Sequence, residues 1–102
     1  MALEIIIAPL TKRDLEDIAA TIAADNAAAA IRLVDRIEKA TLLLAARPYA
    51  GARFLLQTAR PLRKMSVHPY ILFYRVDAGE LGIVRVLHAA RDLANPSLFK
   101  GE

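Results

Sequence analysis

The stretch from Leu62 to Asp92 constrains the fold of this chain more than any other part of the sequence. It consists largely of β-branched, aliphatic and aromatic residues, and it is interrupted at Pro69 and again at the turn sequence Asp77-Ala78-Gly79-Glu80. Residues of the first kind favour strands, whereas proline and glycine break them. The stretch therefore predicts three consecutive short strands, most simply an antiparallel meander.

The N-terminal segment from Leu3 to Ala8 predicts another strand, because it is rich in isoleucine and is followed by Pro9, which has no amide donor. Its apolar run is unbroken, which indicates that both faces are covered and that the strand does not lie at an exposed edge. Thr11 is then the expected N-cap of a helix, with Asp14 as an acidic variant of the capping box.

Two helices are expected next, separated near Asn26, which is a good N-cap for the second of them. Both carry apolar residues at helical spacing, and the second should end before Pro48 and Gly51. Helices joined by so short a linker fold back as a hairpin. One apolar side of that hairpin should lie on the sheet.

The predicted order is β-α-α-β-β-β, in a single domain over residues 1–102. Residues 46–60 are expected to form a loop in which Phe54-Leu55-Leu56 pack against the core. A last helical turn is expected around residues 97–99, and the tail from Lys100 should fray. A helix hairpin on one face of a mostly antiparallel sheet is an α+β fold of two layers.

The composition excludes several classes of protein. There is no cysteine, which removes disulfides and thiolate nucleophiles. The net charge is +3 and the positive charge is concentrated in the second half, which suggests a face for nucleic acid or an acidic protein; an ordinary basic surface is the alternative. No apolar run approaches the roughly 20 residues of a membrane span, and no secretory signal is expected. We therefore expect a soluble, cytoplasmic protein.

The candidate functional residues are cationic. The sequence has no glycine-rich phosphate loop and no metal-ligand spacing, so neither a metal nor a cofactor is expected. Cations along the predicted strands could instead bind phosphates or stabilise a phosphoryl transition state. The cationic set is Arg63, Lys64, Arg75, Arg85, His88 and Arg91.

Each member of the cationic set also has a structural interpretation. Arg75 could pair with a carboxylate near the hairpin turn, and Arg91 with a neighbouring carboxylate or carbonyl. His88, at the end of the last strand, is more typical of a hydrogen-bonded residue than of a proton shuttle. Tyr70 and Tyr74 share strand parity, which favours packing on one side over a base-stacking platform.

Three segments match the pattern of a known family most specifically: Leu62-Arg63, Tyr70-Ile71-Leu72-Phe73-Tyr74-Arg75, and Arg85-Val86-Leu87-His88-Ala89-Ala90-Arg91-Asp92. With most of the remaining chain, they resemble the ParE/RelE superfamily of toxins from bacterial toxin–antitoxin pairs, the ParE branch in particular. The resemblance implies the β-α-α-β-β-β fold and a small cytoplasmic toxin of the plasmid-stabilisation type, neutralised by an antitoxin. ParE-like members are known for poisoning DNA gyrase, whereas RelE-like members cleave messenger RNA on the ribosome.

The sequence departs from RelE-like members at residues that metal-free RNA cleavage needs. Those members have an arginine after the tyrosine that opens the third strand, where this chain has Ile71. They also have an arginine and then a tyrosine beyond the last strand, where Ala89 and Ala90 follow here and no tyrosine occurs. Of the cationic set, only Lys64 clearly matches a residue that RelE-like members use for cleavage. We therefore expect a gyrase poison that binds without catalysis. The alternatives are a ribosome-dependent endonuclease, or a non-toxic antitoxin-binding partner in a repression complex.

A ParD-like antitoxin is the partner that the resemblance implies. Its tail could lay an amphipathic helix in an apolar groove along the helix hairpin, or add a strand at the sheet edge. No membrane partner is expected, and no sequence-specific nucleic-acid binding by the chain alone. Each candidate contact could instead be a core residue. Leu42 and Leu43 lie off the main apolar stripe of their helix, which favours them as contact residues. The candidates are Leu15, Ile18, Ile22, Leu33, Leu42 and Leu43.

Overall fold

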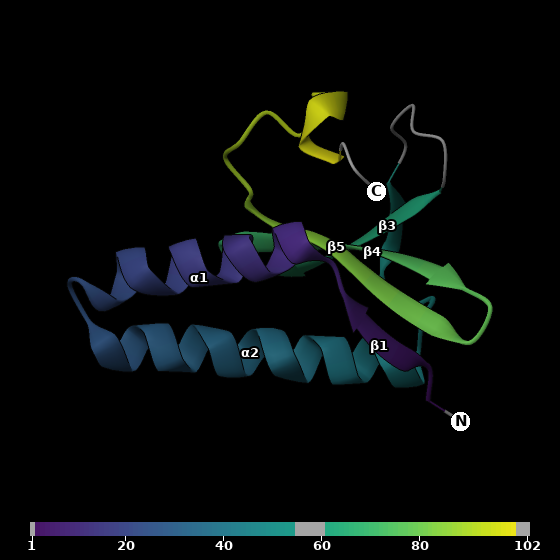
Figure 1. The fold of residues 1–102 in the computed structure, drawn as a ribbon, viewed down its shortest axis with the longest axis horizontal. Coiled ribbons are helices and arrows are strands. Elements are labelled where there is room, and N and C mark those ends of the chain that lie inside the picture. Colours follow the sequence, from purple (N-terminus) through teal and green to yellow (C-terminus); the bar gives the residue numbers. More distant parts are fainter. Residues whose placement is uncertain (1, 55–60, 100–102) are drawn as a thin grey trace.

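The structure, a computed structural model, describes residues 2–54 and 61–99. Two helices lie side by side under a sheet, and a short 3-10 helix lies beyond the other side of the sheet (Figure 1). In chain order the elements are β1 (Glu4–Ile7), α1 (Pro9–Ala23), α2 (Ala27–Ala46), β2 (Ala52–Phe54), β3 (Leu62–Val67), β4 (Tyr70–Asp77), β5 (Glu80–His88) and η1 (Pro96–Phe99).

The sheet has the strand order β1-β5-β4-β3-β2. β1 runs parallel to β5, and the other neighbours are antiparallel. The predicted α+β class, with a helix hairpin on a mostly antiparallel sheet, is confirmed, as is the meander of β3, β4 and β5. None of the helices in the described ranges has the length and hydropathy of a membrane span.

The predicted loop at residues 46–60 contains a strand, β2, so that prediction was incomplete. β2 pairs with the first half of β3, with Arg53 opposite Arg63. A strand of three residues is too short for alternation of polar and apolar side chains to be read from the sequence. Phe54 packs against the core as expected, whereas Leu55 and Leu56 lie outside the described residues, as do residues 100–102.

β1 lies at an edge of the sheet, so the prediction of a strand covered on both sides was wrong. Its only neighbouring strand is β5 within the described residues, and Ile6 is 40% exposed. Ile5 and Ile7 pack against the core on the helix side. The amide of Leu3 donates to the carbonyl of Ala45 at the end of α2. The apolar run therefore reflects packing against the helices, not a neighbour on each edge.

α1 begins at Pro9, with Ala8 as its N-cap, so the predicted cap at Thr11 was wrong. Proline suits the first turn of a helix, because its missing amide hydrogen has no partner to lose there. Thr11 is instead buried, and its hydroxyl donates to the carbonyl of Ile83 at 2.7 Å. The predicted cap of α2 is confirmed, since the Asn26 side chain accepts from the amide of Ala29.

β5 contains a bulge, and the sheet packs against a hydrophobic core on each of its faces. Tyr74 lies opposite Ile83 while Phe73 lies opposite Arg85, so Val84 is an extra residue in β5. The core on the helix side includes Ile83, and the core on the other side includes Val84. In that second core the rings of Phe54, Phe73 and Phe99 make edge-to-face and tilted contacts with one another.

The fully buried Tyr74 fastens the segment between α2 and β2 to the sheet. Its hydroxyl donates to the carbonyl of Pro48 at 2.8 Å and accepts from the amide of Gly51 at 3.0 Å. A Cβ at Gly51 would lie only 2.4 Å from that hydroxyl oxygen, so glycine is needed for this approach. Tyr70 also packs on the helix-side core, which confirms the predicted common side of the two tyrosines.

Replacing Tyr74 by Phe should lower the free energy of unfolding by about 1–3 kcal/mol, because the Gly51 amide and the Pro48 carbonyl lose a buried partner. Urea unfolding followed by circular dichroism measures this. Tyr49→Phe is the control, because the Tyr49 side chain is exposed, and it should change stability by less than about 0.5 kcal/mol. Equal effects of the two variants would contradict the assigned role.

Candidate functional site

Arg85 makes polar contacts with two other elements of the fold. Its Nε donates to Asp14 Oδ2 at 2.8 Å, and its Nη2 donates to Asp14 Oδ1 at 2.7 Å. Its Nη1 donates to the carbonyl of Leu98. Both side chains of the ion pair are only 12% exposed. Arg85 therefore joins β5 to α1 and to η1.

α1 takes the place of a neighbouring strand where β1 ends. β1 pairs with β5 only as far as Ile83. Beyond that point, Thr11 donates to the Ile83 carbonyl and Asp14 Oδ2 accepts from the amide of Val86 at 3.0 Å. Thr11 and Asp14 are three residues apart on one helix face, so both reach the same edge of β5. The side chains of α1 satisfy backbone groups that a strand would otherwise pair.

Arg63 and Arg75 donate to carbonyls within the chain. Arg63 Nη2 lies 2.8 Å from the carbonyl oxygen of Gly51, and its guanidinium lies 5.1 Å from the centroid of the Tyr49 ring. Arg75 is only 6% exposed, and its Nη1 lies 2.9 Å from the carbonyl oxygen of Pro61. Lys64 Nζ lies 5.6 Å from the centroid of the Phe54 ring.

His88 and Arg91 share a hollow of about 210 Å³ beside the end of β5. His88 Nδ1 accepts from the amide of Ala90 at 3.0 Å, which confirms the predicted hydrogen-bonded residue at the strand end. The ring of Tyr70 meets that of His88 edge to face, with the centroids 5.3 Å apart. The hollow is lined by Asp14, Asp17, Ile18, Tyr70, Val86, Leu87, His88 and Arg91.

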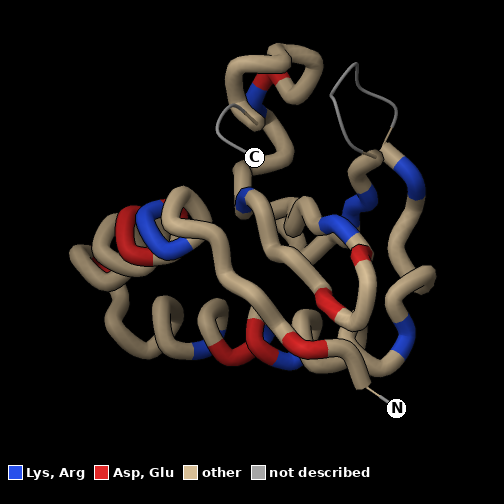
Figure 2. The backbone as a smooth tube through the Cα atoms, turned by 45° about the vertical axis from the view of Figure 1, so that its right-hand side comes forward, with Lys and Arg blue, Asp and Glu red and all other residues tan. Residues whose placement is uncertain are grey.

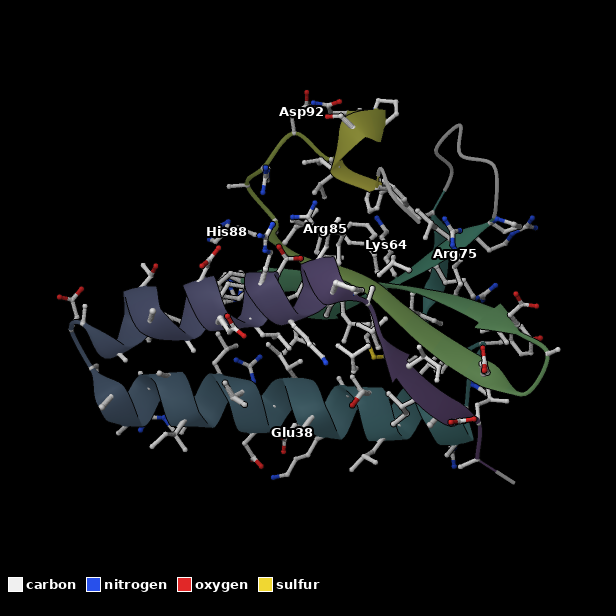
Figure 3. The ribbon with its side chains drawn as sticks, viewed as in Figure 1. Glu38, Lys64, Arg75, Arg85, His88 and Asp92 are labelled. Carbon is white, nitrogen blue, oxygen red and sulfur yellow. The ribbon has the colours of Figure 1, made fainter. Side chains whose placement is uncertain are left out.

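The cationic set is therefore distributed over the sheet. Figure 3 shows His88 and Arg75 towards opposite sides of the view, with Arg85 between them. Of the cationic set, His88 and Arg91 line one hollow together, and two carboxylates line it with them. In residues 2–54 and 61–99, no group of three His, Asp or Glu side chains is placed to hold a metal ion. The predicted functional role of these cations stays a prediction.

The predicted antitoxin contacts fall into two groups. Leu33 is buried in the core, and Leu15, Ile18 and Ile22 pack against that core from the helix hairpin. The other two candidates face solvent: Leu42 is 63% exposed and Leu43 is 45% exposed. Their position off the apolar stripe is confirmed, while the antitoxin contact stays a prediction.

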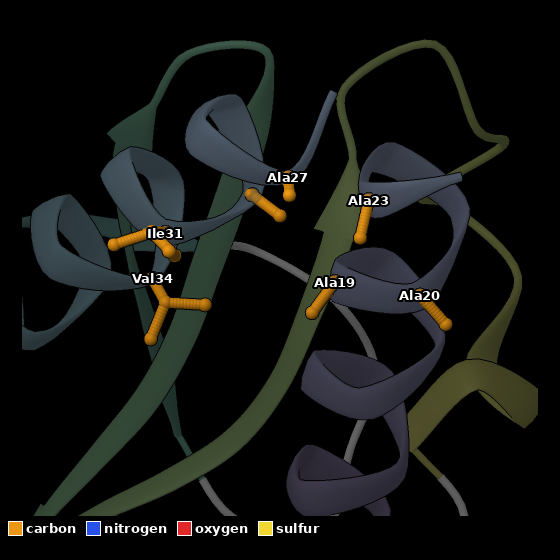
Figure 4. Close-up of a pocket in the computed structure, with 7 residues that line it drawn as sticks. Ala19, Ala20, Ala23, Ala27, Ile31 and Val34 are labelled. Atoms are coloured by element: carbon orange, nitrogen blue, oxygen red, sulfur yellow. The ribbon is translucent and has the colours of Figure 1, made fainter. Parts of the chain in front are cut away.

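An apolar groove lies between the two helices near their connection, as expected along the hairpin, but none of the predicted antitoxin contacts lines it (Figure 4). It has a volume of about 460 Å³ and is made mostly of alanine side chains, with Ile31 at 70% exposure beside them. Alanine favours helix regardless of its surroundings, so it does not reveal which face stays open. The lining residues are Ala19, Ala20, Ala23, Ala27, Ala30, Ile31 and Val34.

Comparison with known proteins decides the family. Residues 5–93 match the sequence model of a family described as the ParE toxin of the type II toxin–antitoxin system parDE. The chain belongs to the ParE toxin family. This confirms the resemblance drawn from its strand segments.

The fold is also similar to that of a solved structure described as the chromosomal ParDE toxin–antitoxin system from P. aeruginosa. The TM-score is 0.71 at 18% sequence identity, over 85% of this chain and 96% of that chain. At this identity, the likeness shows a shared fold. A search of curated proteins gives no match.

Replacing Asp14 by Ala should lower the free energy of unfolding by about 3–5 kcal/mol, because it leaves the buried Arg85 charge and the Val86 amide without their partner. Thermal and urea unfolding measure the loss.

The matched control is Asp35→Ala, which removes an exposed ion pair between Asp35 and Lys39 on α2. A hydrogen bond with Asp35, and then its negative charge, raise the pKa of Lys39. Exposed pairs contribute little, so this variant should lose far less stability than Asp14→Ala does. If the two aspartate variants were equally stable, the edge of β5 would not depend on Asp14.

Proposed function

We propose that this ParE-family toxin poisons DNA gyrase by binding it and trapping its DNA-cleavage complex, and that a ParD-like antitoxin neutralises it. One observation carries the proposal. Three cations that a metal-free nuclease could use are engaged within the fold, since Arg85 is paired with Asp14 and Arg63 and Arg75 donate to carbonyls. On this proposal the chain acts by binding its target and does not catalyse a reaction.

Metal-free RNA cleavage requires a group that activates the 2′-hydroxyl and cations that stabilise the charge on the phosphorane. The position at which RelE-like members carry an arginine is Ile71, which is only 9% exposed and packs in the second core. A buried aliphatic side chain cannot neutralise a phosphate. This favours binding over catalysis.

The surface that we assign to the target contains the cationic set. Its exposed members, His88 and Arg91, are available for direct contact, whereas Arg75 and Arg85 are mostly buried and would act by holding that surface in place. Gyrase works on chromosomal and plasmid DNA, so we place the toxin in the cytoplasm.

The double variant His88→Ala/Arg91→Ala should inhibit gyrase at least about tenfold less, since hot-spot residues carry most of the energy of an interface. The measurement is supercoiling of relaxed plasmid by purified gyrase, with cleaved DNA counted in parallel. Arg13→Ala is the control, because Arg13 is an exposed cation on α1, and it should inhibit as the native chain does. If an excess of folded native toxin left gyrase activity unchanged, this result would contradict the proposal.

A second candidate function is ribosome-dependent cleavage of messenger RNA. The observation that favours it is the hollow that brings together Tyr70, His88 and Arg91, which are residue types able to act as acid, base and phosphate ligand. Two carboxylates, Asp14 and Asp17, line the same hollow and would repel a phosphate. Cleaved transcripts on ribosomes treated with the native toxin, absent with His88→Ala, would establish this function instead.

A third interpretation is a non-toxic chain that only binds an antitoxin within a repression complex. Expression without the antitoxin separates it from both toxic functions. Growth arrest supports a toxin, whereas normal growth with accumulated folded protein supports the repression partner.

For the antitoxin contact, we propose the outer side of the helix hairpin, with Leu42 and Leu43 as its exposed anchors. The apolar groove of Figure 4 lies on the same hairpin and would take small apolar side chains from an amphipathic helix. Leu15, Ile18, Ile22 and Leu33 would support this surface from beneath, because they pack on the sheet.

The variant Leu42→Asp/Leu43→Asp should bind the ParD-like antitoxin encoded beside its gene at least about tenfold more weakly, because a carboxylate would be buried at the contact. Isothermal titration calorimetry measures the affinity. The control Thr21→Asp adds one carboxylate at an exposed position on α1 and should leave affinity unchanged. An unchanged affinity of the leucine variant for the antitoxin would show that the antitoxin binds another surface.

A further inference from the structure

A hollow of about 450 Å³ lies between the helix hairpin and the turn that joins β3 to β4. It shares no lining residue with the apolar groove of Figure 4. Its volume falls within the roughly 300–1,000 Å³ that is usual for small-molecule sites. The lining residues are Ile22, Ala29, Arg32, Leu33, Arg36, Pro69 and Tyr70.

Two arginines of α2 line this hollow without a partner from the described parts of the chain. Arg32 and Arg36 are exposed, and neither forms an ion pair or a hydrogen bond with another described residue. They are four residues apart on a helix, so their side chains are neighbours on one face. Like charges at this spacing disfavour the helix, and an anion held by both would relieve that cost.

The acidic residues of α2 do not neutralise these arginines. Figure 2 shows acidic and basic residues interspersed along α2, and the acidic ones are Asp35 and Glu38. Asp35 is paired with Lys39 at 2.9 Å, and neither acid lines the hollow. None of the lining residues is acidic, in contrast to the hollow at His88, which two carboxylates line. An anion in this hollow therefore meets positive charge without a lining carboxylate.

The rest of the lining is apolar and includes two rings. Three aliphatic side chains come from the helices, and Pro69 and Tyr70 come from the side of the β3–β4 turn. Tyr70 is partly exposed, and its ring meets the His88 ring edge to face, with the centroids 5.3 Å apart. A planar ring can stack on the face of a tyrosine, so the hollow suits a ligand with a flat apolar part.

The cationic and the flat apolar parts of the hollow together define the class of ligand. Two guanidinium groups match a dianion better than a singly charged carboxylate, and guanidinium binds phosphate oxygens in pairs. A phosphate monoester carries a charge of about −1.5 to −2 at pH 7. Inorganic phosphate would leave the apolar lining in contact with water, and a fatty acid has neither the double charge nor the flat ring. A nucleoside monophosphate has both.

The neighbouring hollow favours a free nucleotide over a single strand of nucleic acid. Tyr70 lines both this hollow and the hollow at His88, so the two adjoin at its side chain. The next phosphate of a strand that continued past Tyr70 would meet Asp14 and Asp17, which repel it. A free nucleotide avoids that repulsion.

We propose that this hollow binds a free nucleoside monophosphate, with its phosphate between Arg32 and Arg36 and its base against Tyr70 and Pro69. The arginines supply charge-assisted hydrogen bonds to the phosphate, and the tyrosine ring supplies a stacking surface for the base. This site goes beyond the proposed function, because nucleotide binding there requires neither gyrase nor the antitoxin.

The experiment titrates AMP into the native chain alone, with amide chemical shifts to locate the site and calorimetry to measure the affinity. The amides of Ala29, Arg32 and Tyr70 should shift, and high salt should weaken binding. Adenosine lacks the phosphate and inorganic phosphate lacks the ring. Each should therefore bind at least about tenfold more weakly than AMP.

Variants of the chain separate the contact with the phosphate from the contact with the base. Arg32→Gln/Arg36→Gln should bind AMP at least about tenfold more weakly. Lys12→Gln/Arg13→Gln, a matched loss of two exposed cations on α1, should lose far less affinity. Tyr70→Leu should lower the affinity for AMP to near that for inorganic phosphate, whereas Tyr70→Phe keeps the ring and should bind as the native chain does. Because both arginines are exposed, their variant decides the question even if Tyr70→Leu does not fold.

Equal losses in the two cation variants would show that the overall charge attracts the nucleotide, and would overturn the proposal. Equal affinities for AMP and inorganic phosphate, or an oligothymidine that binds when AMP does not, would also overturn it. Gyrase and the antitoxin are absent from this assay, so failure of the nucleotide site would leave the proposed function standing.

Discussion

Beyond Ile83, the edge of β5 has no neighbouring strand in the described structure, and α1 supplies the missing partners. Asp14 accepts from the Val86 amide and holds Arg85, which in turn holds the carbonyl of Leu98. A buried carboxylate is stable only when its charge and lone pairs are satisfied, and here the guanidinium and the amide both do so. This contact fixes α1 against the sheet and fastens η1 to the opposite face. The positions of both covering layers therefore depend on it.

That arrangement fills both faces of the sheet and engages several cations of the strands within the fold. The helices cover one face of the sheet, and the aromatic cluster around Phe73 and Phe99 fills much of the other. Several cations of the strands serve the fold itself, as Arg75 does at the carbonyl of Pro61. What remains open is the outer side of the helix hairpin, the hollow at His88, and the edge of β3. These surfaces are exposed to partner proteins, and the proposed contacts with the target and the antitoxin draw on the first two.

The sequence predicted the elements whose signals are local. Asn26 caps α2 as expected, and the breaks at Pro69 and Gly79 bound the strands of the meander. It failed where a distant partner decides the outcome. Thr11 has the chemistry of an N-cap, but the carbonyl of Ile83 lies within reach of its hydroxyl, and Pro9 allows the helix to begin earlier. β2 is only three residues long and exists because β3 offers it an edge.

By itself, the sequence determined the α+β class, the order of the longer elements and the resemblance to ParE toxins, because periodicity, helix caps, strand breaks and motif residues lie close together along the chain. Only the tertiary structure decided that Arg85 is paired with Asp14, that Ile71 is buried, and that half of the edge of β3 stays open. The role of a charged side chain depends on whether a carboxylate, a carbonyl or water stands in front of it. That neighbour is set by packing between residues as far apart as α1 and β5, so no local pattern records it.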